Sequence, residues 1–425
     1  MMQILILGSG GREHALAWKI SQSPRCSRLF IAPGNAGTTL VGENVPVSPN
    51  DFEAVAEFVL KHDVGMVVVG PEEPLVNGIA DYFAQMPGLK HVMLVGPTRA
   101  GALLEGSKAF AKEFMQRHGI PTAAYRSFTR HTAEQGKAFL ESMTAPYVLK
   151  ADGLAAGKGV VICASIAEAT QTLEEMLLND MFGKASATVV VEEFLEGIEL
   201  SAFALTDGSS YCMLPAAKDY KRVGNGDTGP NTGGMGAISP VPFAGPDFMQ
   251  KVEQRIVIPT IEGLKKEGVK YCGFLFFGIM NVGGNPYLIE YNTRLGDPET
   301  QAIVPRIKTD LVDLFEAAVI GALHTCRVEV TNEVAVTLVL VSGGYPGNFE
   351  KGFAVSGIDQ VNNCNVFYAG LMGDSHQPVT NGGRVLAVTS IANTLEEAIE
   401  NTYRQAACID FKKKYFRYDI GKDLQ

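Results

Sequence analysis

Short apolar runs alternate with helical patterns along the first hundred residues of the chain. The runs lie at residues 3–7, 28–32, 65–69 and 91–95. Runs of this kind are typical of strands buried on both faces of a parallel sheet. The segments between them, such as 12–20 and 51–62, carry apolar residues at helical spacing. The pattern therefore predicts a βαβ domain over residues 1–104, with ligands expected at the loops that follow its strands.

The pattern changes after residue 104, where helices and strands no longer alternate regularly. Residues 104–119 predict a helix that has Ser107 as its N-cap and Gly119 at its end. The further expected elements are a hairpin across 147–163, a helix near 165–179, strands on either side of Gly197, helices at about 246–267 and 298–323, and strands at about 274–282 and 286–292. Residues 222–236 hold six glycines and no periodicity, which is typical of a long functional loop.

The last hundred residues predict a separate α+β domain. Apolar strand patterns lie at 333–341, 366–370 and 382–390, and a helical pattern follows at 394–408. We therefore expect a multidomain α/β and α+β protein divided into residues 1–104, 105–327 and 328–425.

Composition narrows the class of protein. With 425 residues, 46% of them apolar and 19% charged, the chain suits an ordinary multidomain globular protein. A net charge of −10 argues against a nucleic-acid partner, and the longest apolar runs are too short for a membrane span. The seven cysteines are scattered without a C-x-x-C pair, and the amino terminus lacks the pattern of a signal peptide. These features favour a cytoplasmic location.

The first glycine-rich motif, "ADGLAAGKGVVIC", does not fit a P-loop. Three residues separate Gly153 from Gly157, where a P-loop has four, and Gly159 stands where a magnesium-binding hydroxyl is required. Strand-like patterns also flank the motif on both sides, whereas a P-loop leads from a strand into a helix. The motif therefore predicts a glycine-rich hairpin.

The second motif, "GSGGREH" near the amino terminus, does not fit a dinucleotide site. Gly8 and Gly10 match the fingerprint, but Glu13 occupies the place of its third glycine. The next strand ends at Ala32 and Pro33 without the carboxylate that would bind a ribose. Binding of a phosphate or a phosphosugar at this turn and helix start remains a reasonable alternative.

The segment "PYLIEYNTRLGDPETQ" contains the residues best suited to bind a metal ion. Side chains alternate along a strand, so Glu290 and Asn292 should project from one face and Tyr291 from the other. A carboxylate beside an amide oxygen suits Mg²⁺, and Arg294 on the same side would suit a carboxylate or phosphate. Taken alone, a strand ending in Glu-x-Asn is more often an ordinary polar strand end.

Several further motifs, taken in their order along the chain, support the metal site and resemble those of a known family. They are "GSGGREHALAW", "APGNAGT", "GPEEPLVNGIAD", "LEGSKAFAKEFM", "KADGLAAGKGVVI", "KDYKRVGNGDTGPNTGGMGA", "EYNTRLGDPETQ" and "TNGGRVLAVT". Together they span residues 8 to about 390 and resemble the phosphoribosylamine–glycine ligases (glycinamide ribonucleotide synthetases) of the ATP-grasp superfamily. "TGPNTGGMGA" and "NGGRVL" are the motifs specific to this family within the superfamily.

The resemblance implies a fold and a reaction. The fold would comprise an amino-terminal pre-ATP-grasp βαβ domain, a central ATP-grasp domain with a mobile lid at about 122–190, and a carboxy-terminal α+β domain. The reaction would join glycine to 5-phospho-β-D-ribosylamine at the expense of ATP, through a glycyl phosphate, in de novo purine synthesis. The implied cofactors are ATP and Mg²⁺, with Mn²⁺ as an alternative. The expected state is a monomer or weak homodimer.

The resemblance also implies roles for individual residues. Lys108, Lys150, the hairpin residues Gly153, Gly157, Lys158 and Gly159, and the loop residues Arg222 and Asn231 would contact the nucleotide phosphates. Glu192, Phe194 and Leu195 would flank the adenine, and Glu199 would take the ribose. Glu290 and Asn292 would bind the metal, while Arg294 and Lys150 would serve catalysis. The implied substrate-binding residues are Gly10, Gly11, Asn35, Gly37, Asp219, Arg294 and Asp297.

One departure from the superfamily and three rival functions bear on this interpretation. ATP-grasp enzymes often have an acidic metal ligand about a dozen residues before Glu-x-Asn, where this chain has Gly278. The rivals are another ATP-grasp purine ligase or carboxylase, a non-catalytic nucleotide-binding regulator and an NAD-dependent dehydrogenase. Loops 33–37 and 222–236 favour the glycine ligase, the presence of Lys150, Glu290 and Asn292 argues against a regulator, and the incomplete dinucleotide motif argues against a dehydrogenase.

Overall fold

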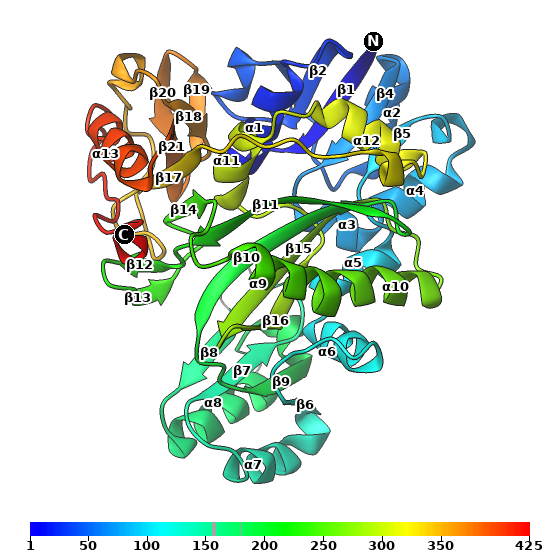
Figure 1. Ribbon diagram of the computed structural model, residues 1–425, viewed down its shortest axis with the longest axis vertical. Coiled ribbons are helices and arrows are strands. Elements are labelled where there is room, and N and C mark those ends of the chain that lie inside the picture. Colours follow the sequence, from blue (N-terminus) through cyan, green and yellow to red (C-terminus); the bar gives the residue numbers. More distant parts are fainter. Residues whose placement is uncertain (155–158, 180) are drawn as a thin grey trace.

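The computed structural model describes residues 1–154, 159–179 and 181–425. Figure 1 shows a large body, which contains both ends of the chain, and a small lobe attached to one side of it. Among the described residues, no helix combines the length and apolarity that crossing a bilayer requires. The seven cysteines are free thiols.

The amino-terminal part forms the expected parallel sheet, in the order β3-β2-β1-β4-β5. Its strands are β1 (Met2–Gly8), β2 (Cys26–Pro33), β3 (Glu43–Asn44), β4 (Val64–Val69) and β5 (Met93–Val95). Its helices are α1 (Gly11–Ile20), α2 (Phe52–Lys61), α3 (Glu72–Asn77), α4 (Ile79–Gln85) and α5 (Arg99–Gly106). The apolar runs are buried on both faces of the sheet, which explains why they contain few polar residues.

The small lobe has its own sheet and its own apolar core. Antiparallel strands β6 (Tyr125–Thr129), β9 (Thr188–Glu193), β7 (Tyr147–Ala151) and β8 (Val160–Cys163) lie side by side in that order. Helices α7 (Ala133–Glu141) and α8 (Ile166–Leu178) cover one face. The glycine-rich segment joins β7 to β8, so the predicted hairpin is confirmed at its two strands.

A long antiparallel sheet runs through the large body in the order β16-β15-β10-β11-β14-β17-β21-β18. Its central part comprises β10 (Ile198–Thr206), β11 (Tyr211–Asp219), β14 (Gly236–Ser239), β15 (Gly273–Val282) and β16 (Asn285–Asn292). The carboxy-terminal part adds β17 (Val334–Val341), β18 (Asn365–Tyr368) and β21 (Arg384–Ala392), with helix α13 (Leu395–Ala406) and the separate hairpin of β19 (Leu371–Asp374) and β20 (Gln377–Thr380). Strand β14 pairs with both β11 and β17, so the two parts share one backbone ladder.

Helices pack on both faces of the central strands. Along β10, Leu200, Ala202 and Ala204 face α6 (Lys108–Arg117), α9 (Pro246–Val252) and α10 (Ile258–Lys266), whereas Phe203 faces α12 (Leu311–Val319) and the amino-terminal sheet. This alternation follows from the two-residue period of a strand.

The helix predicted over 298–323 is wrong, because the chain forms two shorter helices there. Helix α11 (Glu299–Ile303) passes into a short 3₁₀ turn that contains Pro305, and α12 begins after its N-cap Asp310. Proline cannot donate the backbone hydrogen bond of a helix interior, and the Asp310 carboxylate accepts from the Val312 N–H.

The glycine-rich segment 222–236 contains more regular structure than predicted. Strands β12 (Arg222–Gly224) and β13 (Thr228–Asn231) form a short hairpin, in which Arg222 lies opposite Asn231. The expected cap at Ser107 is confirmed, since its hydroxyl accepts from the Phe110 N–H at the start of α6.

Candidate active site

A cleft of about 500 Å³ lies between the small lobe and the large body. It gathers residues that are far apart in the sequence, from Arg12 near the start of the chain to Arg384 near its end. The predicted site residues that line it are Lys108, Lys150, Gly153, Gly159, Glu192, Glu199, Asp219, Asn231, Glu290, Asn292, Arg294 and Asp297. The structure thus brings most of the candidate residues to one place.

One wall of the cleft is a buried group of lysines around Glu192. Lys150 on β7 and Glu192 on β9 lie on neighbouring strands, and Lys150 Nζ is 3.0 Å from Glu192 Oε2. Lys112 on α6 reaches the same oxygen at 2.8 Å. The other oxygen, Glu192 Oε1, is buried without a hydrogen-bond partner among the described residues. Two lysines on one carboxylate leave this wall with a net positive charge.

Lys108 extends that positive wall from the first turn of α6. Its Nζ donates to the Gly153 carbonyl at 3.0 Å, so the helix start lies against the glycine-rich segment. Burial lowers the pKa of Lys108, an effect that nearby Glu290 opposes. A lysine desolvated in this way gains more from an anionic ligand than an exposed lysine does.

The opposite wall carries Glu290 and Asn292 on one face of β16, as predicted. Between them, Tyr291 points into the core, where its hydroxyl lies 2.8 Å from Thr260 Oγ1. Burial would raise the pKa of Glu290, but Lys221, Lys150 and other nearby cations hold it below its usual value. Glu290 is therefore ionised at neutral pH and suited to a cation.

Arg294 joins this wall although β16 ends at Asn292. Its guanidinium lies 2.7 Å from Glu105 Oε1 and 3.3 Å from Glu72 Oε2. The amide nitrogen of Asn292 also faces Glu105, 2.9 Å from Oε1 in the orientation that satisfies both groups. Glu105 thus fixes both residues, and its second oxygen accepts from the Thr293 N–H at 2.7 Å.

The floor of the cleft carries the carboxylates of Glu199, Asp219 and Glu299. Lys221 Nζ lies 2.6 Å from Glu199 Oε2, and the hydroxyl of Ser201 donates to Glu299 at 3.0 Å. Burial raises the pKa of Asp219 to about 7, and Glu299 adds to the rise, whereas Lys221 opposes it.

Asp297 links the cleft to the amino-terminal glycines. Its carboxylate lies 3.2 Å from Arg384 and accepts from the Gln301 amide at 2.7 Å. A β-carbon built on Gly10 would approach Asp297 Oδ2 to 3.2 Å, so this backbone passes close to the edge of the cleft. A β-carbon on the next residue, Gly11, would collide with the side-chain nitrogen of Gln301.

Other predicted residues do not line the cleft. The Asn35 side chain is used within its own loop, donating to the Ser9 and Tyr368 carbonyls and accepting from the Gly37 N–H. The Arg222 guanidinium donates across its hairpin to the Gly229 carbonyl at 2.8 Å. Phe194 and Leu195 follow β9 outside the cleft lining, and Gly157 and Lys158 lie outside the described residues.

Sequence reasoning missed several charged residues of the cleft, namely Arg12, Glu72, Glu105, Lys112, Lys221, Glu299 and Arg384. Lys112 had a usable signal, because it follows Lys108 by four residues and so shares its helix face. The others come from loops and helix ends whose meeting depends on the tertiary fold.

The residues present fit a divalent cation that is held mainly by its substrate. Gly278 pairs with Glu290 across β15 and β16, so this ladder position offers no second carboxylate. No group of three or more acidic, histidine or cysteine side chains suited to a metal occurs among the described residues. Mg²⁺ commonly uses one or two protein ligands and completes its shell with phosphate oxygens and water, which matches Glu290 and Asn292.

Comparisons with known proteins agree with this architecture. The family description "Phosphoribosylglycinamide synthetase" matches in three parts: its N domain over residues 2–105, its ATP-grasp (A) domain over 106–300 and its C domain over 335–423. The biotin carboxylase domain of 2-oxoglutarate carboxylase from Hydrogenobacter thermophilus, at 16% identity, shares the fold with a TM-score of 0.73 over 98% of this chain and 92% of its own. The fold and the cleft define an ATP-grasp protein.

Nearer relatives define the family. Phosphoribosylamine–glycine ligase from Chlorobaculum tepidum is 47% identical over 99% of both chains, and the Pasteurella multocida protein of the same name is 45% identical over 99% of this chain and 97% of its own. The crystal structure of the Thermotoga maritima ligase is 36% identical, with a TM-score of 0.84 over 98% of this chain and 99% of that one. The chain belongs to the phosphoribosylamine–glycine ligase family.

Proposed function

We propose that the protein joins glycine to 5-phospho-β-D-ribosylamine, forming glycinamide ribonucleotide, ADP and phosphate in de novo purine synthesis. The main support is that one cleft is lined by three cations, Lys108, Lys150 and Arg294, together with Glu290 and Asn292. Full-length similarity to phosphoribosylamine–glycine ligases supports the choice of substrates. We further propose a cytoplasmic enzyme that is a monomer or weak homodimer.

The reaction requires activation of a poor electrophile. A glycine carboxylate oxygen attacks the γ-phosphorus of ATP, ADP leaves, and glycyl phosphate forms. The sugar amine then attacks the glycyl carbonyl, loses a proton, and expels phosphate. Such chemistry depends mainly on positioning and charge neutralisation, which a desolvated cluster of lysines and arginines supplies.

The nucleotide is assigned to the lobe side of the cleft. Lys108 and Lys150 would neutralise the phosphates beneath the glycine-rich segment, whose described members are Gly153 and Gly159. The adenine would lie beside Glu192, Phe194 and Leu195. The unpartnered Glu192 Oε1 could accept from the adenine amino group. Glu199 would take the ribose through the oxygen that Lys221 does not hold, and Asn231 and Arg222 would approach the phosphates.

The co-substrates are assigned to the side of the large body. Arg294, fixed by Glu105 and Glu72, would orient glycine or its acyl phosphate, and Asp219 would line the same pocket. Gly10, Gly11 and Asp297 would hold the phosphosugar at the cleft edge. Asn35 and Gly37 would shape the adjoining loop.

Glu290 and Asn292 would hold Mg²⁺, and Mn²⁺ would suit the same oxygen ligands. When bound, the ion neutralises charge on the transferred phosphoryl group. The two residues lie on one strand face and Glu290 is ionised, so β16 would present both ligand oxygens to the ion.

The test is ADP release from Mg-ATP with glycine, with and without phosphoribosylamine generated from ribose 5-phosphate and ammonia. We expect release to require both co-substrates and to fall at least about a hundredfold in Glu290→Ala. Glu262→Gln, at an exposed position on α10, is the control and should keep full activity. Turnover with bicarbonate and another purine intermediate, but not with this pair, would overturn the proposed substrates.

A further inference from the structure

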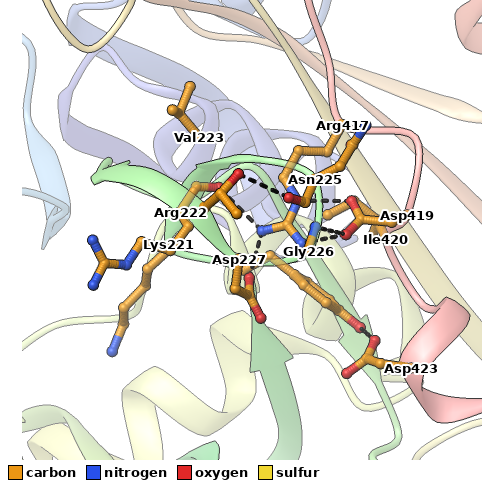
Figure 2. A network of polar contacts seen from close by, with 12 residues as sticks. Lys221, Arg222, Val223, Asn225, Gly226, Asp227, Arg417, Asp419, Ile420 and Asp423 are labelled. Carbon is orange, nitrogen blue, oxygen red and sulfur yellow. Dashed lines mark hydrogen bonds and ion pairs between the residues drawn. The ribbon is translucent and has the colours of Figure 1, made fainter.

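The end of the chain holds the hairpin of β12 and β13 in place. We call residues 222–231 the cleft hairpin and residues 415–423 the carboxy-terminal strap. The two segments are almost two hundred residues apart in the sequence, yet they are joined by a dense set of hydrogen bonds (Figure 2). Neither the family resemblance nor the cleft lining assigns a role to the strap.

Arg417 is the centre of this network and is only 1% exposed. Its guanidinium makes two parallel bonds to Asp419, from Nε at 2.9 Å and from Nη2 at 2.7 Å. Nη1 donates to Asp227 Oδ1 at 2.6 Å and to the Arg222 carbonyl at 3.1 Å. Figure 2 shows the guanidinium between the two carboxylates, one from each segment.

Further bonds fix the hairpin backbone along its length. The Tyr415 hydroxyl donates to the Val223 carbonyl at 2.9 Å, and the Gly226 N–H donates to Asp419 Oδ2 at 2.7 Å. The Tyr418 N–H donates to the Asn225 side chain at 2.8 Å. The strap therefore holds both β12 and the turn that follows it.

The held strand leads directly into the cleft. Lys221, which pairs with Glu199, immediately precedes β12, and Arg222 lies opposite Asn231 in the hairpin register. The Thr232 N–H donates to the Lys221 carbonyl at 2.7 Å, so the two ends of the hairpin are joined where they enter the cleft. A displacement of β12 would therefore move Lys221 and Asn231 together.

A second anchor lies at the cleft side of the hairpin. Arg384 donates to the Gly233 carbonyl at 2.7 Å, and the Gly233 N–H donates to the Tyr345 hydroxyl at 2.9 Å. These bonds hold the base of the hairpin, whereas Arg417 holds the arm that extends away from the cleft. Arg417 does not line the cleft itself.

We propose that Arg417 is a positioning residue for nucleotide binding: it clamps the cleft hairpin and thereby fixes Lys221 beside Glu199 at the ribose and Asn231 beside the phosphates. The inference rests on the proposed function for the identity of the nucleotide. Arginine suits this position because its planar fork can bond Asp419 twice while its remaining nitrogen reaches Asp227 and a carbonyl. A lysine could satisfy only part of that set.

The experiment compares Arg417→Met, Arg417→Lys and Asp227→Asn with wild type by calorimetric titration of Mg-ATP. Asp227 has a positive φ of 52°, which asparagine tolerates, and its side chain is 61% exposed, so Asp227→Asn should fold normally. Glu350→Gln is the control, because it breaks the exposed pair with Lys413 in the same domain without touching the hairpin.

We expect the Kd for Mg-ATP to rise about tenfold in Arg417→Met, and by about threefold in Arg417→Lys and in Asp227→Asn. The control should match wild type. Trypsin should cut after Lys221 or Arg222 faster in the three variants, because the hairpin opens. In the complete reaction, KM for ATP should rise more than kcat falls.

Unchanged Kd and unchanged cleavage in Asp227→Asn and Arg417→Lys would overturn the inference. So would a fall in kcat at constant KM, because a purely structural loss lowers the amount of active enzyme and leaves the affinity of the remainder intact. If wild type binds Mg-ATP but does not ligate glycine, the proposed function fails while the titrations still decide the role of Arg417.

Discussion

Lys112 Nζ lies 2.8 Å from Glu192 Oε2, and both residues are only 2% exposed. The same ammonium donates to Thr122 Oγ1 at 2.7 Å, and that hydroxyl donates to the Leu288 carbonyl on β16 at 2.6 Å. One buried charge therefore joins α6, the entry to the small lobe, the lobe's strand β9 and the wall that carries Glu290.

Lys112→Met should weaken this junction. Burial lowers the pKa of Lys112 to about 8 despite Glu192, which shows how strongly the site is desolvated. Because Lys150 remains on Glu192, we expect a loss of about 2 kcal/mol in unfolding free energy rather than the larger cost of an unpaired buried charge. Urea unfolding measures this, and Lys266→Met, at an exposed position on α10, should unfold at the wild-type midpoint. Equal midpoints for both variants would contradict the junction.

His14 should make the folded protein sensitive to acid. Its Nδ1 accepts from the Tyr368 N–H at 2.8 Å, and burial lowers its pKa from 6.5 to about 4. The unfolded chain therefore binds the extra proton between pH 6.5 and 4. The stability due to neutral His14 is complete above pH 6.5 and decreases by about 3 kcal/mol on acidification to pH 4.

The measurement is unfolding free energy against pH for wild type and His14→Asn, which keeps an acceptor near the position of Nδ1. The difference between the two proteins should shrink as the pH falls from 6.5 to 4. His131→Asn, at an exposed histidine, should follow the wild-type curve throughout. A constant difference between wild type and His14→Asn would show that His14 does not titrate on unfolding.

Gly37→Ala should disturb the contact between the amino-terminal loop and the carboxy-terminal sheet. A β-carbon there would lie 2.5 Å from both His14 Cε1 and Tyr368 Cγ, which are buried ring atoms with little room to move. We expect a loss of about 1–3 kcal/mol in unfolding free energy. Gly245→Ala is the matched control, because nothing lies within 4 Å of its added carbon. Thermal melting that ranks the two variants equally would contradict the steric argument.

The proposed lid, residues 122–190, should be protected from proteolysis by saturating Mg-ATP. The small lobe has its own core, which includes Phe128, Leu149 and Leu173, so it can move as a unit. Its contacts to the body, such as the bond from Lys108 to Gly153, lie at the nucleotide side of the cleft. Cleavage followed by mass spectrometry should slow with Mg-ATP but not with AMP. Equal rates in all conditions would contradict nucleotide-driven closure.

Local patterns in the sequence were enough for elements that bury a regular face. The apolar run at 65–69 became β4, and the alternation at 286–292 placed Glu290 and Asn292 on one face of β16. The helix expected at 298–323 failed because apolar periodicity continued through Pro305, which ends the helical hydrogen bonding. Periodicity reports which face is buried, and it does not report whether the backbone can continue.

Site residues that belong to recognisable motifs could be predicted from the sequence. Site residues that act through contacts between distant segments could not. Lys150 and Glu290 stand in motifs, but Glu105 acquires its importance from Arg294 and Thr293, almost two hundred residues further along the chain. Nothing near Arg417 in the sequence indicates a link to Asp227. Such pairings depend on the docking of whole domains, which local patterns do not specify.

The pairing of β14 with β17 has a consequence for dividing the chain into fragments. A fragment ending before Val334 would lose the partner of β14 and leave the backbone groups of Gly236–Ser239 unpaired at a sheet edge. The same fragment would uncover the apolar side chain of Ile238, which packs against the carboxy-terminal core. Exposed edges of this kind recruit strands from other molecules. We therefore expect each of the two fragments to be insoluble when it is expressed alone. Co-expression of both fragments should restore their solubility.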